Sequence, residues 1–240
     1  MAKSELIKDF ARNKLDLESA LKQLKLLLID LNKQELVDWV NYELQGYPEK
    51  VELPSYRLYG GNLKGTFLNY NTKCSNVPIP LRNDIPEVIK ECTEKVHFRE
   101  SISSLKRLQS ADGRVNLSIP GNLLPSIQGC AAVSMTYLMS ACIEVSDIAV
   151  TEIISTVENK IMDILIALEA EFGVLDSLDI DLSGTKDKDI EKTRQIICNI
   201  IYDNHIEIGN NNKIKDSLFN CKYRKERRWQ IRINKFGFVG

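Results

Sequence analysis

Basic and aromatic side chains are concentrated in the stretch that follows Cys221, KYRKERRWQIRINKFGFVG, which holds seven Lys and Arg residues against one Glu. Cations neutralise phosphates and aromatic rings stack on bases, so this composition predicts contact with nucleic acid. The residues that would make this contact are Lys222, Arg224, Lys225, Arg227, Arg228, Trp229 and Arg232. A second interpretation stays open, because Trp229, Ile231 and Ile233 alternate with polar residues as in a half-buried strand, whose basic neighbours would keep an edge soluble.

Other patterns that carry chemistry elsewhere are weak here. His97 and His205 are the only histidines, so a metal site would have to recruit other ligands from distant segments. We expect His97 on a helix surface. The loop DIDLSGTKDKDI, residues 179–190, begins like a calcium-binding loop, but its twelfth position is Ile190 where a bidentate glutamate is needed. We therefore predict a solvated loop, and neither a metal nor a cofactor site.

Two nucleophile and nuclease patterns also lack the context that they need. The spacing Ser-x-x-Lys occurs at both 19–22 and 103–106, without the companion motifs of serine acyl-transfer enzymes. Glu158 and Lys160 form a Glu-x-Lys pair, but they lie in a predicted helix, where side chains two positions apart diverge. We interpret this pair as solvated surface and assign no catalytic residue.

The overall composition is that of a soluble globular protein. Of the 240 residues, 43% are hydrophobic and 27% charged, and the net charge is -1. Residues 1–221 are acidic, whereas the segment after them is basic. Six scattered cysteines without a C-x-x-C pair favour free buried thiols in a reducing compartment. The N-terminus has no apolar signal-peptide core and no helix is uncharged enough to span a bilayer, so we expect a cytoplasmic protein that does not bind membranes.

Residues 4–46 show the pattern of three helices. A short one follows Ser4, a leucine-rich amphipathic one runs from Leu17 to Leu31, and a third runs from Lys33 to Gln45. Asp16 and Asn32 precede the second and third helices, where N-cap residues accept bonds from first-turn amides. The sequence therefore predicts a helical hairpin.

The third helix ends in the segment ELVDWVNYELQGYP, residues 35–48. Gly46 supplies the positive-φ residue that ends helices, and Pro48 prevents continuation. We interpret Trp39 and Tyr42 as packed side chains rather than a binding surface, and expect Tyr47 to fold back onto the helix end.

The remaining pattern alternates between strands and helices. Short segments broken by Gly and Pro at 54–80 predict strands, and 84–108 predicts a helix. The strongest strand is 133–145, in which the odd-numbered side chains are expected to be buried. A long helix follows from its expected cap Asp147 to Phe172, and another helix ends near Tyr202.

These elements predict an α+β fold, in which an N-terminal helical hairpin packs with a small mixed or antiparallel sheet and a long central helix. We expect this domain to span 1–203. Residues 204–240 would then form a hairpin around the Gly and Asn residues at 209–212, followed by the basic extension.

The segment from Leu17 to Tyr59 resembles the N-terminal part of the AbiTii domain family, named for bacterial abortive-infection systems. The shared pattern is a leucine-rich helix, then E-L-x-x-W-V-x-x-E-L-x-G-Y-P and a short E-L-P-x-Y-R strand, and weaker similarity extends to about residue 200. The matching residues with an expected structural role are Leu36, Trp39, Val40, Leu44, Gly46, Tyr47 and Pro48. Glu43, Leu53, Pro54, Tyr56 and Arg57 also match.

The resemblance implies a component of a bacterial anti-phage system and carries over no catalytic residue. Our leading hypothesis is a non-enzymatic sensor, adaptor or oligomerising module that associates with its own copies or with a partner defence protein. The alternative is a nucleic-acid-binding or nucleic-acid-damaging effector that uses the basic extension. A third interpretation is a hydrolase whose site has no recognisable motif.

Overall fold

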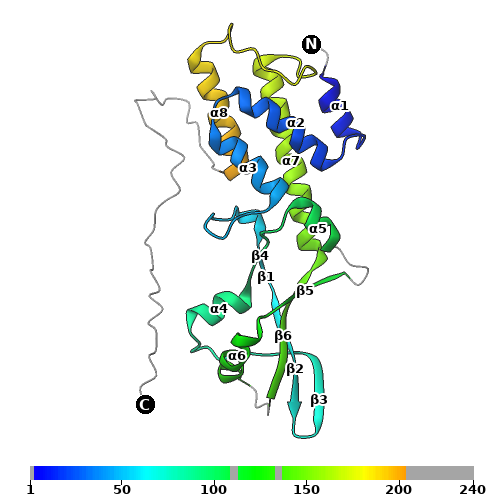
Figure 1. Ribbon diagram of the computed structural model, residues 1–240, viewed down its shortest axis with the longest axis vertical. Coiled ribbons are helices and arrows are strands. Elements are labelled where there is room, and N and C mark those ends of the chain that lie inside the picture. The colour runs from blue at the N-terminus through cyan, green and yellow to red at the C-terminus, as the bar shows by residue number, and fades with distance from the viewer. Residues whose placement is uncertain (1–2, 109–112, 133–136, 204–240) are drawn as a thin grey trace, which may run out of the picture. The chain divides into compact units, whose positions relative to one another are not determined.

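The computed structural model describes residues 3–108, 113–132 and 137–203. Its first three helices confirm the predicted helical hairpin and the short helix before it (Figure 1). They are α1 (Glu5–Ala11), α2 (Leu17–Asp30) and α3 (Gln34–Gln45). The Asp16 carboxylate accepts a bond of 3.0 Å from the Ser19 amide, as the N-cap prediction requires.

The prediction for Asn32 is wrong. Asn32 has φ 52° and forms the left-handed turn between α2 and α3, while Lys33 occupies the N-cap position of α3 without a side-chain bond. The connection is so short that Asn32, which was expected to cap α3, is needed in the turn that ends α2. Asn tolerates this conformation better than most residues.

The long helix α7 (Asp147–Phe172) is the central packing element of the helical part. It contacts α1, α2, α8 (Asp187–Tyr202), α5 (Ile102–Leu108) and the 3-10 turn η1 (Ser55–Arg57). Its N-cap is Ser146, which accepts a bond from the Ile148 amide, so Asp147 is the first helical residue rather than the cap. Gly173, with φ 85°, ends it as predicted.

All paired strands in the described part of the chain are antiparallel. A two-stranded ribbon joins β1 (Leu58–Gly60) and β4 (Lys95–His97). A four-stranded sheet has the order β3-β2-β6-β5, with the strands β2 (Asn62–Asn69), β3 (Thr72–Pro78), β5 (Arg114–Ser118) and β6 (Tyr137–Ser146). The α+β prediction is confirmed, and of its two alternatives for the sheet the antiparallel one is found.

The predicted burial pattern of the strongest strand holds for only part of its length. Ala141, Ile143 and Val145 are buried as expected, but Tyr137 and Met139 are exposed and Leu138 is buried in their place. The register between β2 and β6 shifts at this point, because Thr66 pairs with Ser140 whereas Phe67 pairs with Leu138. The extra residue forms a β-bulge, which exchanges the two faces of the strand.

The helix predicted at 84–108 is interrupted. The chain forms α4 (Glu87–Glu94), then β4, and only then α5. His97 therefore lies on a strand, exposed, and not on a helix surface. The segment after β5 contains the 3-10 turn η2 (Gly121–Leu123) and the helix α6 (Leu124–Cys130), which the sequence pattern did not indicate.

Helices α4 and α6 cover one face of the four-stranded sheet (Figure 1). Ile89 of α4 and Ile127 of α6 pack with Leu63, Phe67 and Leu138 of the sheet in a core of their own. This core supports the strands that carry the surfaces described below.

Two further predictions have partial outcomes. Cys74, Cys130, Cys142 and Cys198 are free thiols, but only Cys198 is buried. The predicted hairpin at 204–221 and the basic extension lie outside the described residues, so the division of the chain at 203 stays a prediction.

Candidate functional site

The motif residues converge on a buried polar cluster that we call the motif cluster, made of Trp39, Glu43, Tyr47, Tyr56 and Arg57. Trp39 and Glu43 are one turn apart on α3, and Tyr47 follows that helix by one further step of four residues. Tyr56 and Arg57 come from η1, since the E-L-P-x-Y-R segment predicted as a strand forms a 3-10 turn instead. The Glu43 and Arg57 side chains are both 0% exposed.

Both oxygens of the Glu43 carboxylate accept hydrogen bonds within the cluster. Oε2 accepts from the Arg57 guanidinium, and Oε1 accepts from the hydroxyls of Tyr47 at 2.6 Å and Tyr56 at 2.7 Å. The Trp39 indole donates to the Tyr56 hydroxyl at 2.9 Å. A buried charge is stable only when paired and hydrogen-bonded, and Glu43 meets this condition.

The Arg57 guanidinium links the cluster to a third segment. It donates to the carbonyls of Phe98 at 3.0 Å and Glu100 at 2.6 Å, and lies 4.8 Å above the Tyr47 ring. The cluster thus joins α3, η1 and the connection between β4 and α5.

Burial and charge shift the ionisation of the cluster in a consistent direction. Burial, followed by the adjacent Glu43 charge, raises the pKa of Tyr56 and of Tyr47 well above the usual range. Burial alone would lower the pKa of Arg57, but the Glu43 carboxylate outweighs it and the pKa is raised. The phenols therefore stay neutral and the guanidinium charged, so the cluster is a fixed structural network.

Gly46 brings the end of α3 close to this same connection. It has φ 97°, and a Cβ there would lie 2.9 Å from the Arg99 carbonyl, which accepts a bond of 2.7 Å from the Tyr47 amide. The other motif residues Leu36 and Val40 are fully buried, Leu44 is half-buried and Pro48 is exposed. Trp39 and Tyr47 are buried, and the half-buried Tyr42 ring lies 5.3 Å from the Tyr47 ring, whereas the ion pair between Glu43 and Arg57 was not foreseen.

Lys160 of α7 connects the motif cluster to the C-terminal end of α8. It is 5% exposed, which contradicts the prediction of a solvated surface residue. Its ammonium lies 5.4 Å from the Tyr56 ring centre and donates to the Ile200 carbonyl at 2.6 Å and to Asp203 at 2.5 Å. A cation at a helix C-terminus stabilises unpaired carbonyls, so Lys160 holds the last turn of α8.

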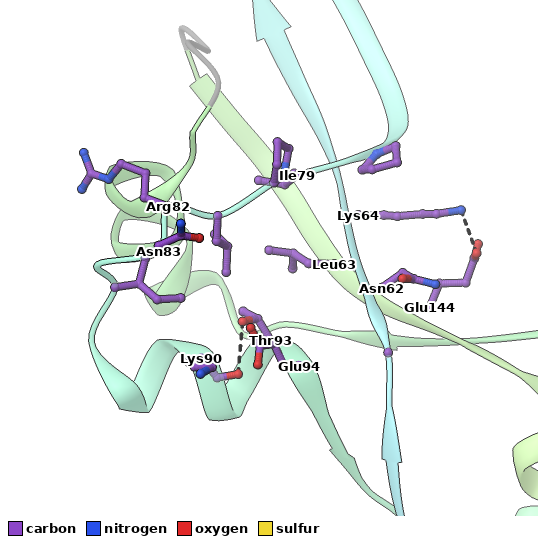
Figure 2. A pocket seen from close by; sticks show the side chains of 15 residues that line it. Asn62, Leu63, Lys64, Ile79, Arg82, Asn83, Lys90, Thr93, Glu94 and Glu144 are labelled. Atoms are coloured by element: carbon purple, nitrogen blue, oxygen red, sulfur yellow. Dashed lines mark hydrogen bonds and ion pairs between the residues drawn. The ribbon is translucent and has the colours of Figure 1, made fainter.

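A hollow of about 750 Å³ opens beside the four-stranded sheet, between β2, the connection from β3 to α4, and α4 itself. Figure 2 shows Leu63 and Ile79 between the Arg82–Asn83 segment on one side and the paired Lys64 and Glu144 on the other. Lys90, Thr93 and Glu94 of α4 complete the wall. Sequence reasoning missed this hollow, because no motif accompanies it.

Large apolar side chains are exposed at the far end of the β2–β3 hairpin and at the start of β6. We call Leu68, Tyr70, Tyr137 and Met139 the hairpin patch, in which Leu68 is half-buried and the other three side chains are exposed. Leu68 pairs directly with Tyr137, and Tyr70 lies in the turn after β2. Tyr70 is 88% exposed, Tyr137 60% and Met139 45%.

The other sequence candidates are not brought together. Ser19 bonds the Asp16 cap, and Asp181 accepts from the Ser183 amide within its own loop. Across 3–108, 113–132 and 137–203, no three His, Cys, Asp or Glu side chains group as metal ligands. None of the helices in these ranges is long and apolar enough to cross a bilayer. The predicted nucleic-acid residues, from Lys222 to Arg232, lie outside the described residues.

The fold and the motif cluster define an α+β module in which a helical unit is joined to an antiparallel sheet through a sealed polar core. The AbiTii family model matches residues 4–194, and the chain belongs to this family. Membership connects it to abortive infection, a form of anti-phage defence. Neither the comparison with curated proteins nor that with solved structures gave a match.

Proposed function

We propose that the chain is a non-enzymatic module of an abortive-infection system, acting as a sensor, adaptor or oligomerising component. It works by associating with further copies of itself or with a partner protein of the same system. The observation that carries this proposal is the contrast in exposure between the motif cluster and the hairpin patch. The charged pair of the cluster is sealed, whereas the patch exposes aromatic and aliphatic side chains.

Contiguous exposed apolar side chains are a common mark of protein association, since their burial removes apolar area from water. Tyr137 and Met139 have this exposure because the β-bulge turns them away from the core. Tyrosine and methionine are also enriched at interfaces. The free thiols of the described cysteines support a reducing compartment, and we propose the cytoplasm.

Sedimentation velocity of the full chain, alone and with the products of neighbouring defence genes, tests the proposal. Tyr137→Glu with Met139→Glu should abolish the faster-sedimenting species, because two charges enter the patch. Leu26→Glu with Ile29→Glu, at exposed apolar positions on α2, introduces the same two charges as a matched control and should leave the species unchanged. A monomer in every condition, or cleavage of a nucleic acid or nucleotide by the chain alone, contradicts the proposal.

The charge asymmetry of the sequence favours one alternative, a nucleic-acid-binding effector that uses the basic extension. The extension holds seven cations against one carboxylate, whereas the preceding residues are acidic. Binding through about 6 phosphates would weaken with salt at a log-log slope of about -5. Unchanged binding after removal of residues 222–240 would exclude this role.

A further inference from the structure

The hollow beside the four-stranded sheet has an apolar floor. Leu63 and Ile79 are buried at its base, and Leu81 and Ile85 are half-buried against the same core. Its volume of about 750 Å³ lies within the range of small-molecule sites. An occupant with a flat or apolar body would therefore cover the solvent-facing carbon atoms of Leu81 and Ile85.

The rim of the hollow is polar, and its charges are unequally engaged. Lys64 is paired with Glu144 at 2.7 Å. Arg82 is engaged, since it donates to the Gly129 carbonyl at 2.9 Å and lies 3.6 Å from Asp84, whereas Lys90 is exposed and makes no ion pair with any residue that the structure describes. Lys90 on α4 thus remains available for an anion at this side of the hollow.

The same rim also offers a hydrogen-bond acceptor. Glu94 is exposed and lies one helical turn from Lys90 on α4, so both side chains line the same wall. Anionic and hydroxyl groups on one ligand would match this pair of opposite charges. A nucleoside phosphate carries both, together with a planar body for the apolar floor.

The hollow also reaches the crossing between the ribbon and the sheet. The Gly61 amide, between β1 and β2, donates to the Glu94 carbonyl at 3.1 Å, where α4 passes into β4. A Cβ at Gly61 would lie 2.2 Å from a methyl group of Ile143, so the backbone at Gly61 packs closely against β6. Gly61 and Glu94 both line the hollow, so a ligand there would contact both residues of this hydrogen bond.

We propose that the hollow binds a nucleoside phosphate, with the phosphate at Lys90, a ribose hydroxyl at Glu94 and the base over Leu63, Ile79 and Leu81. This site goes beyond the proposed association and is independent of the hairpin patch.

Calorimetric titration of the full chain with adenosine 5′-monophosphate, adenosine and inorganic phosphate separates the components of this recognition. The monophosphate should bind at least about tenfold more tightly than either fragment, since each fragment engages only one part of the hollow. Other nucleoside monophosphates should follow it, with differences that report base preference. Binding of inorganic phosphate as tight as that of all monophosphates overturns the proposal, as does no binding of any monophosphate below about 1 mM.

Two variants test the location. Lys90→Glu should weaken binding of the monophosphate about tenfold, because it reverses the available cation. Lys73→Glu makes the same charge change at an exposed position of β3 outside the hollow and should have no effect. Leu81→Trp fills the hollow without changing charge and should also weaken binding. The proposal therefore stays testable if circular dichroism shows that one of the two variants is misfolded. Unchanged affinity in a folded Lys90→Glu or Leu81→Trp chain overturns it.

Hydrogen exchange gives a readout besides affinity. The Gly61 amide should exchange more slowly when the monophosphate is bound, because the ligand spans the Gly61–Glu94 crossing. Unchanged exchange at this amide, at saturating ligand, would place the ligand elsewhere.

Discussion

The motif cluster and the hollow differ in how they use polar side chains. In the motif cluster, Glu43 and Arg57 are 0% exposed and bind one another and their neighbours. In the hollow, Lys90 and Arg82 face solvent at the rim of an apolar floor. Both regions contain the groups that recognise ligands, but only the second leaves them accessible.

The residues of the family signature are sealed, so the proposed functional surfaces lie outside them. The residues that define the signature join α3, η1 and the β4–α5 connection, so they specify the fold. Accessible polar and apolar groups lie outside these residues, among other places at the hollow and the hairpin patch. Four changes can test this division.

The largest effect is expected for Glu43→Ala. It leaves the buried Arg57 guanidinium without its carboxylate, which costs about 3–5 kcal/mol for a buried pair that loses one partner. Glu5→Ala, which removes an exposed pair with Lys8, should change stability far less, because exposed ion pairs are weak. Urea unfolding of both full-length variants measures the difference. Equal losses would show that the motif cluster is no more structural than the surface.

Gly61→Ala should have the next largest effect, now on the sheet side. Its Cβ would lie 2.2 Å from the Ile143 Cγ2 and 3.3 Å from Val96 and Val145 methyl groups. Forcing a methyl group into a packed core costs about 1–3 kcal/mol. Gly184→Ala meets nothing within 4 Å and should be neutral or slightly stabilising. A neutral Gly61→Ala in the same urea experiment would mean that the crossing of ribbon and sheet is loosely packed.

Lys160→Met tests how far the motif cluster extends. The variant keeps an apolar chain of similar length but leaves the Ile200 carbonyl without its donor, at a cost of about 1 kcal/mol. The loss should be local, with faster hydrogen exchange in the last turn of α8. Lys188→Met, at an exposed position of the same helix, should leave exchange unchanged. Equal exchange in the two variants would show that Lys160 does not hold this turn.

The smallest effect concerns pH. Hydrogen bonds from Lys3 and Ser4 lower the pKa of Glu169 from 4.5 to about 2. Because the folded-state pKa is depressed, the stabilisation is present above pH 4.5 and is lost as the pH falls toward 2. After solvent screening the contribution is below about 1 kcal/mol. Glu169→Gln should flatten the acid limb, which is the fall in the free energy of unfolding as the pH decreases from 4.5 toward 2, whereas Glu171→Gln should leave it unchanged. An acid limb that Glu169→Gln leaves unchanged contradicts the assignment.

The elements whose signals are local could be predicted from the sequence. Leu17–Asp30, Gln34–Gln45 and Asp147–Phe172 have helical periodicity, and Asp16 and Gly173 mark helix ends within a few residues of themselves. The burial of Trp39 follows from the same periodicity. These features need no knowledge of a distant partner.

The missed features of the site and of the sheet depend on distant partners. The exposure of Met139 results from its register with β2, which lies about 70 residues earlier. Arg57 reaches Glu43 through a turn, and Lys160 finds its acceptors on α8. The hollow depends on the path of the connection from β3 to α4, which contains two prolines and no regular pattern. Local residue patterns do not reveal which distant segments of the chain are in contact.

The most direct test of the central claim, that the hairpin patch carries function while the motif cluster builds the fold, is phage plating on a host that expresses the complete defence locus. The chain would carry Tyr137→Glu with Met139→Glu, or Leu26→Glu with Ile29→Glu as the matched control, with protein abundance measured for both. The account predicts that the patch variant loses protection at normal abundance and the control keeps it. Full protection by the patch variant would contradict the account.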